Sequence, residues 1–223
     1  RNQYKYLAEV EVHEGYVGQT LAEMTSRTYF IDKVTGPSPD GRVVLTGKDI
    51  LAKLEERKAQ YPIASPGVLY ADLNSTATSF EVANAVDTDY DSDGTIRIGG
   101  EIMTYTSVVN SANGVTFSGV TRATDNTTAE SHDVDASVQQ CKRFEDTRPD
   151  DAMNTLMVTG AGIPSTYPNF AAWTAEVDDY LSFYRLDRLI TEPRDVKALI
   201  GEIAEQCGLY VWWDERLASI EMK

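Results

Sequence analysis

The chain has 223 residues, of which 42% are hydrophobic and 25% are charged, a composition typical of a soluble globular protein and not of a disordered one. No apolar run approaches the ~18 residues needed to cross a bilayer, and no secretory signal is visible. The formal net charge of −15 argues against a sequence-independent nucleic-acid binder, which needs a cationic surface for phosphate.

The first part of the chain, residues 1–68, is predicted to form strands followed by one short helix. The segments "YLAEVEV", "TYFIDKV" and "RVVLTG" alternate like strands, and "TGPSPDG" between the last two is typical of a hairpin loop. The segment "KDILAKLEERKAQYP" then predicts a helix that is capped by Asp49 and ended by Pro62.

The middle part, residues 69–141, is predicted to be a small all-β domain. It is rich in Thr, Ser, Val, Asn and Asp, and "GTIRIGG", "EIMTYTSVV" and "VTFSGVT" alternate with a period of two. The turn "SANG" between the last two segments indicates a hairpin. At least some of its aromatic residues must fill the core of this domain: Tyr70, Phe80, Tyr90, Tyr105 and Phe117.

The last part, residues 142–223, is predicted to be helical from Arg143 and to end in a pair of strands. Helices are indicated by "RPDDAMNTLMVTGAG", "NFAAWTAEVDDYL" and "EPRDVKALIGEIAEQCG", and strands by "LYVWWDERLASIEM". A strand would place Trp212 and Trp213 on opposite faces. The predicted fold class is therefore α+β: a mixed, β-rich domain with short helices, into which the all-β domain is inserted.

Few residues in the chain are candidates for catalysis. His13 and His132 are the only histidines, and neither H-E-x-x-H nor G-x-S-x-G occurs. "GRVVLTGKD" is one residue too long between its glycines for a phosphate loop. Cys141 and Cys207 lack C-x-x-C spacing, so we interpret both as buried thiols, with a disulfide as the alternative. The sequence favours a protein that is not an enzyme and has no cofactor.

The run "DTDYDSDGTIRIGGE" offers one candidate metal site. Asp89, Asp91 and Asp93 fall at positions one, three and five of a calcium loop, with Gly94 at six. The bidentate glutamate belongs at position twelve, which is Gly100. Without that ligand, a polar turn that leads into a strand is the favoured interpretation, and calcium binding is the alternative.

The middle part also resembles a small β-module of tailed-phage proteins. The shared pattern is a "GE-x-x-x-Y" strand, then "GVTR", then "TTA-x-x-H" before a final strand. Here the pattern falls on Gly100, Glu101 and Tyr105, on residues 119–122, and on Thr127, Thr128, Ala129 and His132. The family usually has Gly after the Arg, where this chain has Ala123, so the local turn is expected to differ.

The flanking parts are similar to the central hub of the tail tip of long-tailed phages or prophages. The similar segments run from "RTYFIDKV" to "KAQYP" and from "GIPSTYPNF" to "YVWWDE". The resemblance implies a structural virion protein at the tail tip, made in the bacterial host cytoplasm and cut here from a longer polypeptide. It also implies a homotrimer that binds other tail proteins around a channel for genomic DNA, and it supplies no catalytic residues. The alternative function is a module that binds carbohydrate on the host surface.

Overall fold

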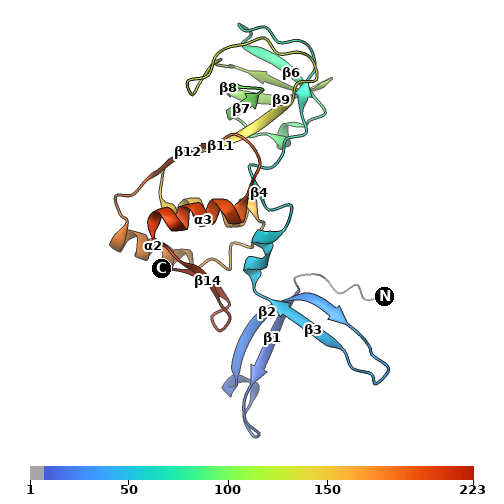
Figure 1. Cartoon of the computed structure of the whole chain (residues 1–223), viewed down its shortest axis with the longest axis vertical. Helices are drawn as coiled ribbons and strands as arrows, with labels where there is room; N and C mark the ends of the chain where they lie inside the picture. Colours follow the sequence, from blue (N-terminus) through green and yellow to red (C-terminus); the bar gives the residue numbers. More distant parts are fainter. Residues whose placement is uncertain (1–7) are drawn as a thin grey trace. The chain divides into compact units, whose positions relative to one another are not determined.

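The computed structural model describes residues 8–223, which form two compact units (Figure 1). The first unit comprises the chain up to Ala59 together with Arg148–Tyr184 and Val196–Lys223. The second unit comprises Gln60–Thr147 and Arg185–Asp195. Strand residues outnumber helical ones, so the fold is α+β and rich in β-structure. Within residues 8–223, no helix combines the length and the apolar character that spanning a membrane requires.

The first unit begins with a three-stranded antiparallel sheet, which we call the N-terminal sheet. Its strands are β1 (Glu9–Glu14), β2 (Thr25–Thr35) and β3 (Val44–Lys48), with β2 in the centre. A short 3-10 helix, η1 (Leu21–Glu23), lies in the turn between β1 and β2. The three predicted strands are confirmed, although the first residues of "YLAEVEV", residues 6 and 7, lie outside the described part of the chain.

The helix predicted after this sheet is shorter than expected. It is the 3-10 helix η2 (Ile50–Glu55), and the Asp49 carboxylate caps it by accepting a hydrogen bond from the Ala52 amide at 3.2 Å. The prediction that it runs to Pro62 is wrong. Strand β4 (Gln60–Tyr61) pairs with β13 (Arg194–Asp195), so the backbone before Pro62 is extended.

The helices of the last part lie where the sequence predicted them. They are α1 (Pro149–Thr155), which continues into one π-helical segment, η4 (Leu156–Gly160), and then α2 (Phe170–Tyr180) and α3 (Val196–Cys207). Arg148 fastens α1 to α2, because its guanidinium donates hydrogen bonds to both Asp150 and Asp178. The buried side chains Trp173 and Val177 of α2 belong to the core of this unit.

The C-terminal strands β14 (Val211–Asp214) and β15 (Ser219–Met222) form the predicted hairpin. Trp213 is buried and contacts the ring of Phe30 at a centroid distance of 5.6 Å, whereas Trp212 is exposed. The Trp213 indole also donates a hydrogen bond of 3.0 Å to the Thr28 carbonyl. The two tryptophans therefore lie on opposite faces, and the buried one anchors the N-terminal sheet.

The second unit contains two four-stranded sheets. Their strand orders are β5-β6-β10-β9 and β12-β11-β7-β8. The strands are β5 (Val68–Leu69), β6 (Ser79–Ala83), β7 (Gly94–Ile98), β8 (Glu101–Tyr105), β9 (Ser107–Ser111), β10 (Gly114–Ser118), β11 (Val138–Thr147) and β12 (Leu186–Ile190). The "SANG" hairpin joins β9 to β10, with Ser111 opposite Gly114. Gly114 has a φ of +136°, which glycine adopts without strain.

One hydrophobic core fills the second unit. Phe117 lies at its centre and contacts Phe80, Tyr90 and Tyr105 at centroid distances of 5.5, 4.9 and 4.7 Å. Tyr70 alone among the five aromatic residues is substantially exposed, at 49%. The prediction that some of these residues fill the core is confirmed.

The prediction that the chain turns helical from Arg143 is wrong. Strand β11 continues to Thr147, because its first half pairs with β7 and its second half pairs with β12. Residues 142–147 and the β12 segment thus belong to the second unit, which is larger than the predicted range of 69–141.

Candidate functional site

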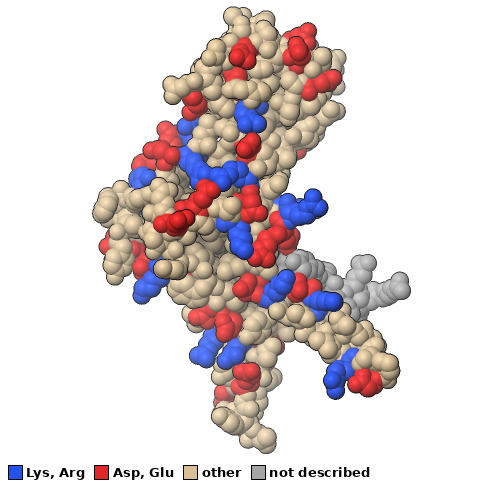
Figure 2. Space-filling view, viewed as in Figure 1, with Lys and Arg blue, Asp and Glu red and all other residues tan. Residues whose placement is uncertain are grey.

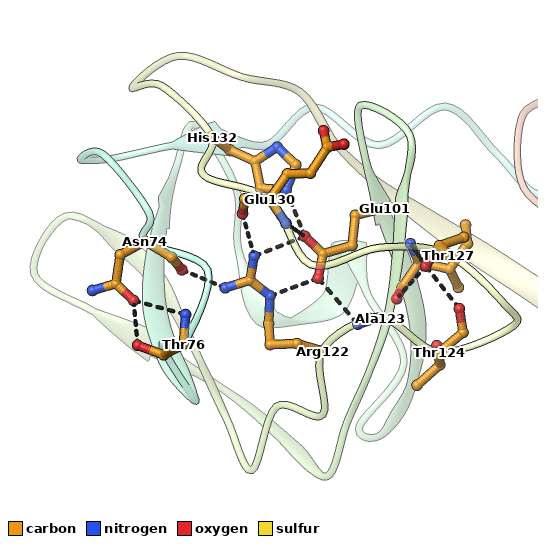
Figure 3. Close-up of polar contacts among 10 residues, drawn as sticks. Asn74, Thr76, Glu101, Arg122, Ala123, Thr124, Thr127, Glu130 and His132 are labelled. Carbon is orange, nitrogen blue, oxygen red and sulfur yellow. Dashed lines mark hydrogen bonds and ion pairs between the residues drawn. The ribbon is translucent and has the colours of Figure 1, made fainter.

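Residues of the β-module pattern meet at a single carboxylate (Figure 3). Glu101 is the first residue of β8, Arg122 follows β10, and His132 lies in the segment before β11. Along the chain, Arg122 lies 21 positions after Glu101 and His132 lies 31 positions after it. Their side chains are almost completely buried, with exposed fractions of 0% for Glu101, 8% for Arg122 and 7% for His132. We call these three residues the Glu101 cluster.

Both oxygens of Glu101 accept several hydrogen bonds. Arg122 binds in a bidentate manner, with Nε 2.8 Å from Oε1 and Nη2 2.7 Å from Oε2. His132 Nε2 lies 2.8 Å from Oε2. The backbone amides of Ala123 and Glu130 each donate to the carboxylate at 3.1 Å. The carboxylate thus joins β8 to three separate points of the chain.

These contacts determine the charge of Glu101. Burial of the carboxyl group raises its pKa, but the hydrogen bonds from Arg122, His132 and the two amides outweigh burial and lower the pKa from 4.5 to about 2. Glu101 is therefore ionised at neutral pH. A buried carboxylate is stable only when it is paired and hydrogen-bonded, and this one is both.

The remaining donors of Arg122 reach the loops that surround the cluster. Nη1 donates to the Asn74 carbonyl, and Nη2 donates to the Glu130 carbonyl at 2.7 Å. The Asn74 side chain in turn accepts from the amide and hydroxyl of Thr76, at 2.9 and 3.0 Å. Asn74 was not identified from the sequence, because its contribution to the cluster is a backbone carbonyl that no residue pattern marks.

The other residues of the pattern shape the chain around the cluster. Gly119 has a φ of +63°, and a Cβ there would lie 2.0 Å from the Thr106 hydroxyl oxygen. The Thr127 hydroxyl accepts from the Ile102 amide at 3.1 Å and donates to the Thr124 carbonyl at 2.8 Å. Ala123 stands where the family usually has Gly, and its φ is +54°, a left-handed conformation that disfavours alanine. These residues position the backbone and present no reactive group.

A second polar network lies beneath the aspartate run. The Tyr105 hydroxyl donates a hydrogen bond of 2.8 Å to Gln140 Oε1. Gln140 Nε2 in turn donates to the Thr95 and Cys141 carbonyls at 3.1 and 3.0 Å. Gln140 also accepts from the Asp91 amide at 3.3 Å. Gln140 was missed by sequence reasoning, because a single uncharged amide within a strand carries no distinctive pattern.

The three candidate calcium ligands, Asp89, Asp91 and Asp93, each contact a different partner. Asp89 ends the 3-10 helix η3 (Asp87–Asp89) and accepts from the Val86 amide at 2.8 Å. Asp91 forms an ion pair with Lys142, and Asp93 accepts from the Ser92 hydroxyl at 3.0 Å. Strand β7 then begins at Gly94. Across residues 8–223, no group of three or more His, Cys, Asp or Glu side chains is placed to hold a metal ion.

The remaining candidate side chains lie apart from one another. His13 is on β1, 3.5 Å from Glu11. Both cysteines are free thiols: Cys141 is buried on β11, as predicted, whereas Cys207 at the end of α3 is only half-buried. Burial raises the pKa of Cys141 to about 12, so this thiol is not a nucleophile at neutral pH.

The first unit has a hollow of about 650 Å³ between η2 and α3. Its walls are mainly aliphatic, and the charged residues that line it are Lys48, Asp49, Glu55 and Lys197. Lys197 lies 2.6 Å from Glu55, and Lys48 lies 3.0 Å from Asp32. Both lysines of the hollow are therefore engaged by carboxylates.

The Glu101 cluster is thus a closed ionic junction that fixes the loops of the β-rich unit. Its carboxylate is inaccessible to a substrate and has its lone pairs occupied by five donors. No protein-family model, curated protein or solved structure matches this chain.

Proposed function

We propose that this chain is a structural part of the central hub at the tail tip of a long-tailed bacteriophage or prophage. There it organises tail tube, baseplate and receptor-binding proteins around the DNA channel. The observation that supports this proposal is the convergence of the pattern residues on Glu101. The pattern residues contact one another and the backbone around them. Such internal contacts support an architectural role more than a catalytic or ligand-binding one.

The division of the chain supports the finer part of the proposal, in which the β-rich unit is a module inserted into the hub. The first unit is assembled from three separate segments, and the second is formed mainly by one continuous segment, Gln60–Thr147. Residues 60–147, produced alone, should then give one cooperative thermal transition and dispersed amide resonances. A disordered spectrum would argue against an inserted, independently folding module.

The negative charge of the chain supports a location in which the protein lies close to DNA but does not bind it. A net charge of −15 repels the phosphate backbone, as the wall of a channel must if DNA is to pass through it. In this proposal the full-length protein forms a homotrimeric ring, and genomic DNA contacts it only in transit.

The alternative function, a module that binds host-surface carbohydrate, has less support. Sugar-binding sites stack the ligand on exposed aromatic rings. In the second unit Tyr90, Tyr105 and Phe117 are buried in the core, and Tyr70 is isolated from them at the surface.

An antibody raised against the chain tests the proposed function. Tailed particles made by the genome that encodes the chain are purified and labelled with the antibody for electron microscopy. The proposal predicts label at the tail tip. Particles that carry no label although the chain is expressed, or label confined to peripheral fibres, would contradict it. Binding of the purified chain to intact host cells would instead favour the alternative.

A further inference from the structure

The turn of the β9–β10 hairpin contains the one Asn–Gly pair of the sequence. Ala112 and Asn113 are the two turn residues, and Ser111 lies opposite Gly114 in the strand register. Asn113 is exposed, and no other asparagine of the chain is followed by glycine. The side-chain carbon of an asparagine is open to attack by the backbone nitrogen of the next residue, and this attack is least hindered when that residue has no Cβ. The turn therefore combines the two conditions that favour this reaction.

The packing of β6 against the turn requires glycine at position 114. A Cβ on Gly114 would lie 2.2 Å from the Val82 carbonyl oxygen and 3.1 Å from the Ala83 Cα, both of which belong to backbone. Gly114 also has a φ of +136°, which disfavours residues with a side chain. The fold itself thus places an unhindered backbone nitrogen directly after Asn113.

The position of the turn makes this nitrogen accessible at low cost. Strand β9 is an edge strand, with β10 as its neighbour in the sheet. Exposed ends of paired strands open locally at a much lower free energy than the core of a unit does. Val115 and Phe117 of β10 are fully buried, so local opening at the turn frees the Gly114 amide while the core stays packed.

The other asparagines of residues 8–223 are less well placed to react. Two of them already use the side-chain oxygen: Asn110 Oδ1 accepts from the Asp87 amide at 2.9 Å, and Asn74 Oδ1 accepts from the Thr76 amide at 2.9 Å. Each of the others is followed by a residue with a side chain, as these two are: Asn84 by alanine, Asn126 and Asn154 by threonine, and Asn169 by phenylalanine.

We propose that Asn113 is a site of spontaneous deamidation. The Gly114 nitrogen gives up its proton to hydroxide and bonds to Asn113 Cγ, which closes a succinimide ring. The Cγ–Nδ2 bond breaks, and the side-chain nitrogen leaves as ammonia. Water then opens the ring at either of its carbonyls and yields aspartate or isoaspartate. The inference goes beyond the proposed function and does not depend on it, because the reaction requires only the folded chain and water.

The product brings two carboxylates together. In the unaltered chain Asn113 Nδ2 donates a hydrogen bond of 2.9 Å to Glu81 Oε2, and Glu81 lies on β6 opposite Thr116 of β10. Deamidation removes this donor and adds a negative charge beside Glu81, and like charges that face each other on a sheet destabilise it. An isoaspartate also adds one carbon to the backbone of a two-residue turn. Deamidation should therefore weaken the hairpin as the chain ages.

The surroundings of the turn do not offset the new charge. The second unit contains sixteen acidic and seven basic residues. Figure 2 shows acidic side chains spread over the surface of this unit, with fewer basic ones between them. The carboxylate that forms at position 113 adds to this excess of negative charge.

Peptide mass spectrometry of the whole chain, incubated at mildly alkaline pH and digested at intervals, tests the site. We expect Asn113 to convert at least about tenfold faster than any other asparagine. The Asn113→Gln variant should show no conversion at this position, because a glutamine side chain forms the corresponding larger ring much more slowly. Conversion of Asn113 no faster than that of Asn110 would overturn the inference. So would an Asn113 that stays intact over several half-lives of a synthetic peptide of residues 110–117.

Two variants test the predicted effect on stability. Asn113→Asp mimics the aspartate product, and Asn74→Asp adds the same charge at another exposed asparagine of the unit, where a carboxylate still accepts from Thr76. Asn113→Asp should lower the midpoint of thermal unfolding by roughly 1–4 °C, and Asn74→Asp should leave it nearly unchanged. The aged unaltered chain should lose stability as Asn113→Asp does, and aged Asn113→Gln should not. Equal losses in the two aspartate variants, or an aged chain as stable as a fresh one, would contradict the predicted role of Glu81.

Discussion

Glu101 and Arg122 form a bidentate ion pair in which the guanidinium Nε and Nη2 lie 2.8 and 2.7 Å from the two carboxylate oxygens. The glutamate side chain is fully buried and the arginine side chain is 8% exposed. This pair, with His132, connects the start of β8 to the loops on either side of it.

Replacing Glu101 with Gln should destabilise the chain strongly. The variant leaves the Arg122 charge buried without a counter-charge, and breaking a buried ion pair in this way typically costs about 3–5 kcal/mol. The matched control is Glu130→Gln, because the Glu130 side chain is exposed and the cluster uses only its backbone. The control should change the free energy of unfolding by no more than about 0.5 kcal/mol. Urea unfolding of both variants measures the difference, and equal costs would refute this role of Glu101.

Stability should fall with acid in a way that depends on Glu101. Folding lowers the pKa of this carboxyl group from 4.5 to about 2, so the folded state binds fewer protons than the unfolded state in this window. Its contribution is therefore complete above about pH 5 and is lost as the pH falls toward 2. The gap in unfolding free energy between the unaltered chain and Glu101→Gln should narrow over that range. Two curves that remain parallel would contradict the assignment of the shifted pKa to Glu101.

Replacing Ala123 with Gly should stabilise the chain. Ala123 has a φ of +54°, and a left-handed conformation costs a residue with a Cβ roughly 1–2 kcal/mol. Glycine removes that cost but loses about 0.5–1 kcal/mol of unfolded-state entropy, so a net gain of roughly 0.5 kcal/mol is expected. Ala129→Gly is the control, because Ala129 is not in the left-handed region and should only lose stability. Thermal unfolding should shift the two variants in opposite directions; a loss in both would show that Ala123 is not strained.

The aspartate run should bind calcium weakly. Asp91 is engaged by Lys142, and Glu101, the nearest acidic residue to position twelve of the loop, is committed to Arg122 and His132. Without a bidentate carboxylate, a dissociation constant on the order of 10⁻⁴ to 10⁻³ M or weaker is expected. Isothermal titration calorimetry with Ca²⁺ measures it. Micromolar affinity that Asp91→Ala abolishes would identify a true calcium loop.

Local patterns predicted the parts of the fold that short-range chemistry determines. Strands β7, β8 and β10 follow from a period of two, and the Asp49 cap follows from its position before Ile50. Strand β11 was only partly predicted, because "KRFEDT" does not alternate and the residues of β12 that pair with it lie 39 to 48 positions later in the chain. Pairing at that distance depends on tertiary contacts that propensity does not encode.

The candidate site was likewise predicted only in part from the sequence. The phage-module resemblance marked Glu101, Arg122 and His132 as a set, but their spacing in the sequence gives no indication that they touch. Gln140 and Asn74 were missed because one acts through a lone amide group and the other through a backbone carbonyl. Such contacts depend on how the loops are arranged in three dimensions, which the residue types alone do not indicate.

A cryo-electron microscopy map of the assembled tail tests the central claim most directly. The proposed function predicts that the described residues of the first unit, 8–59, 148–184 and 196–223, lie in a closed ring around the tail axis, with part of the acidic surface of the chain facing the channel. A map that places these residues only on the outer surface of the tail, away from the channel, would contradict the claim.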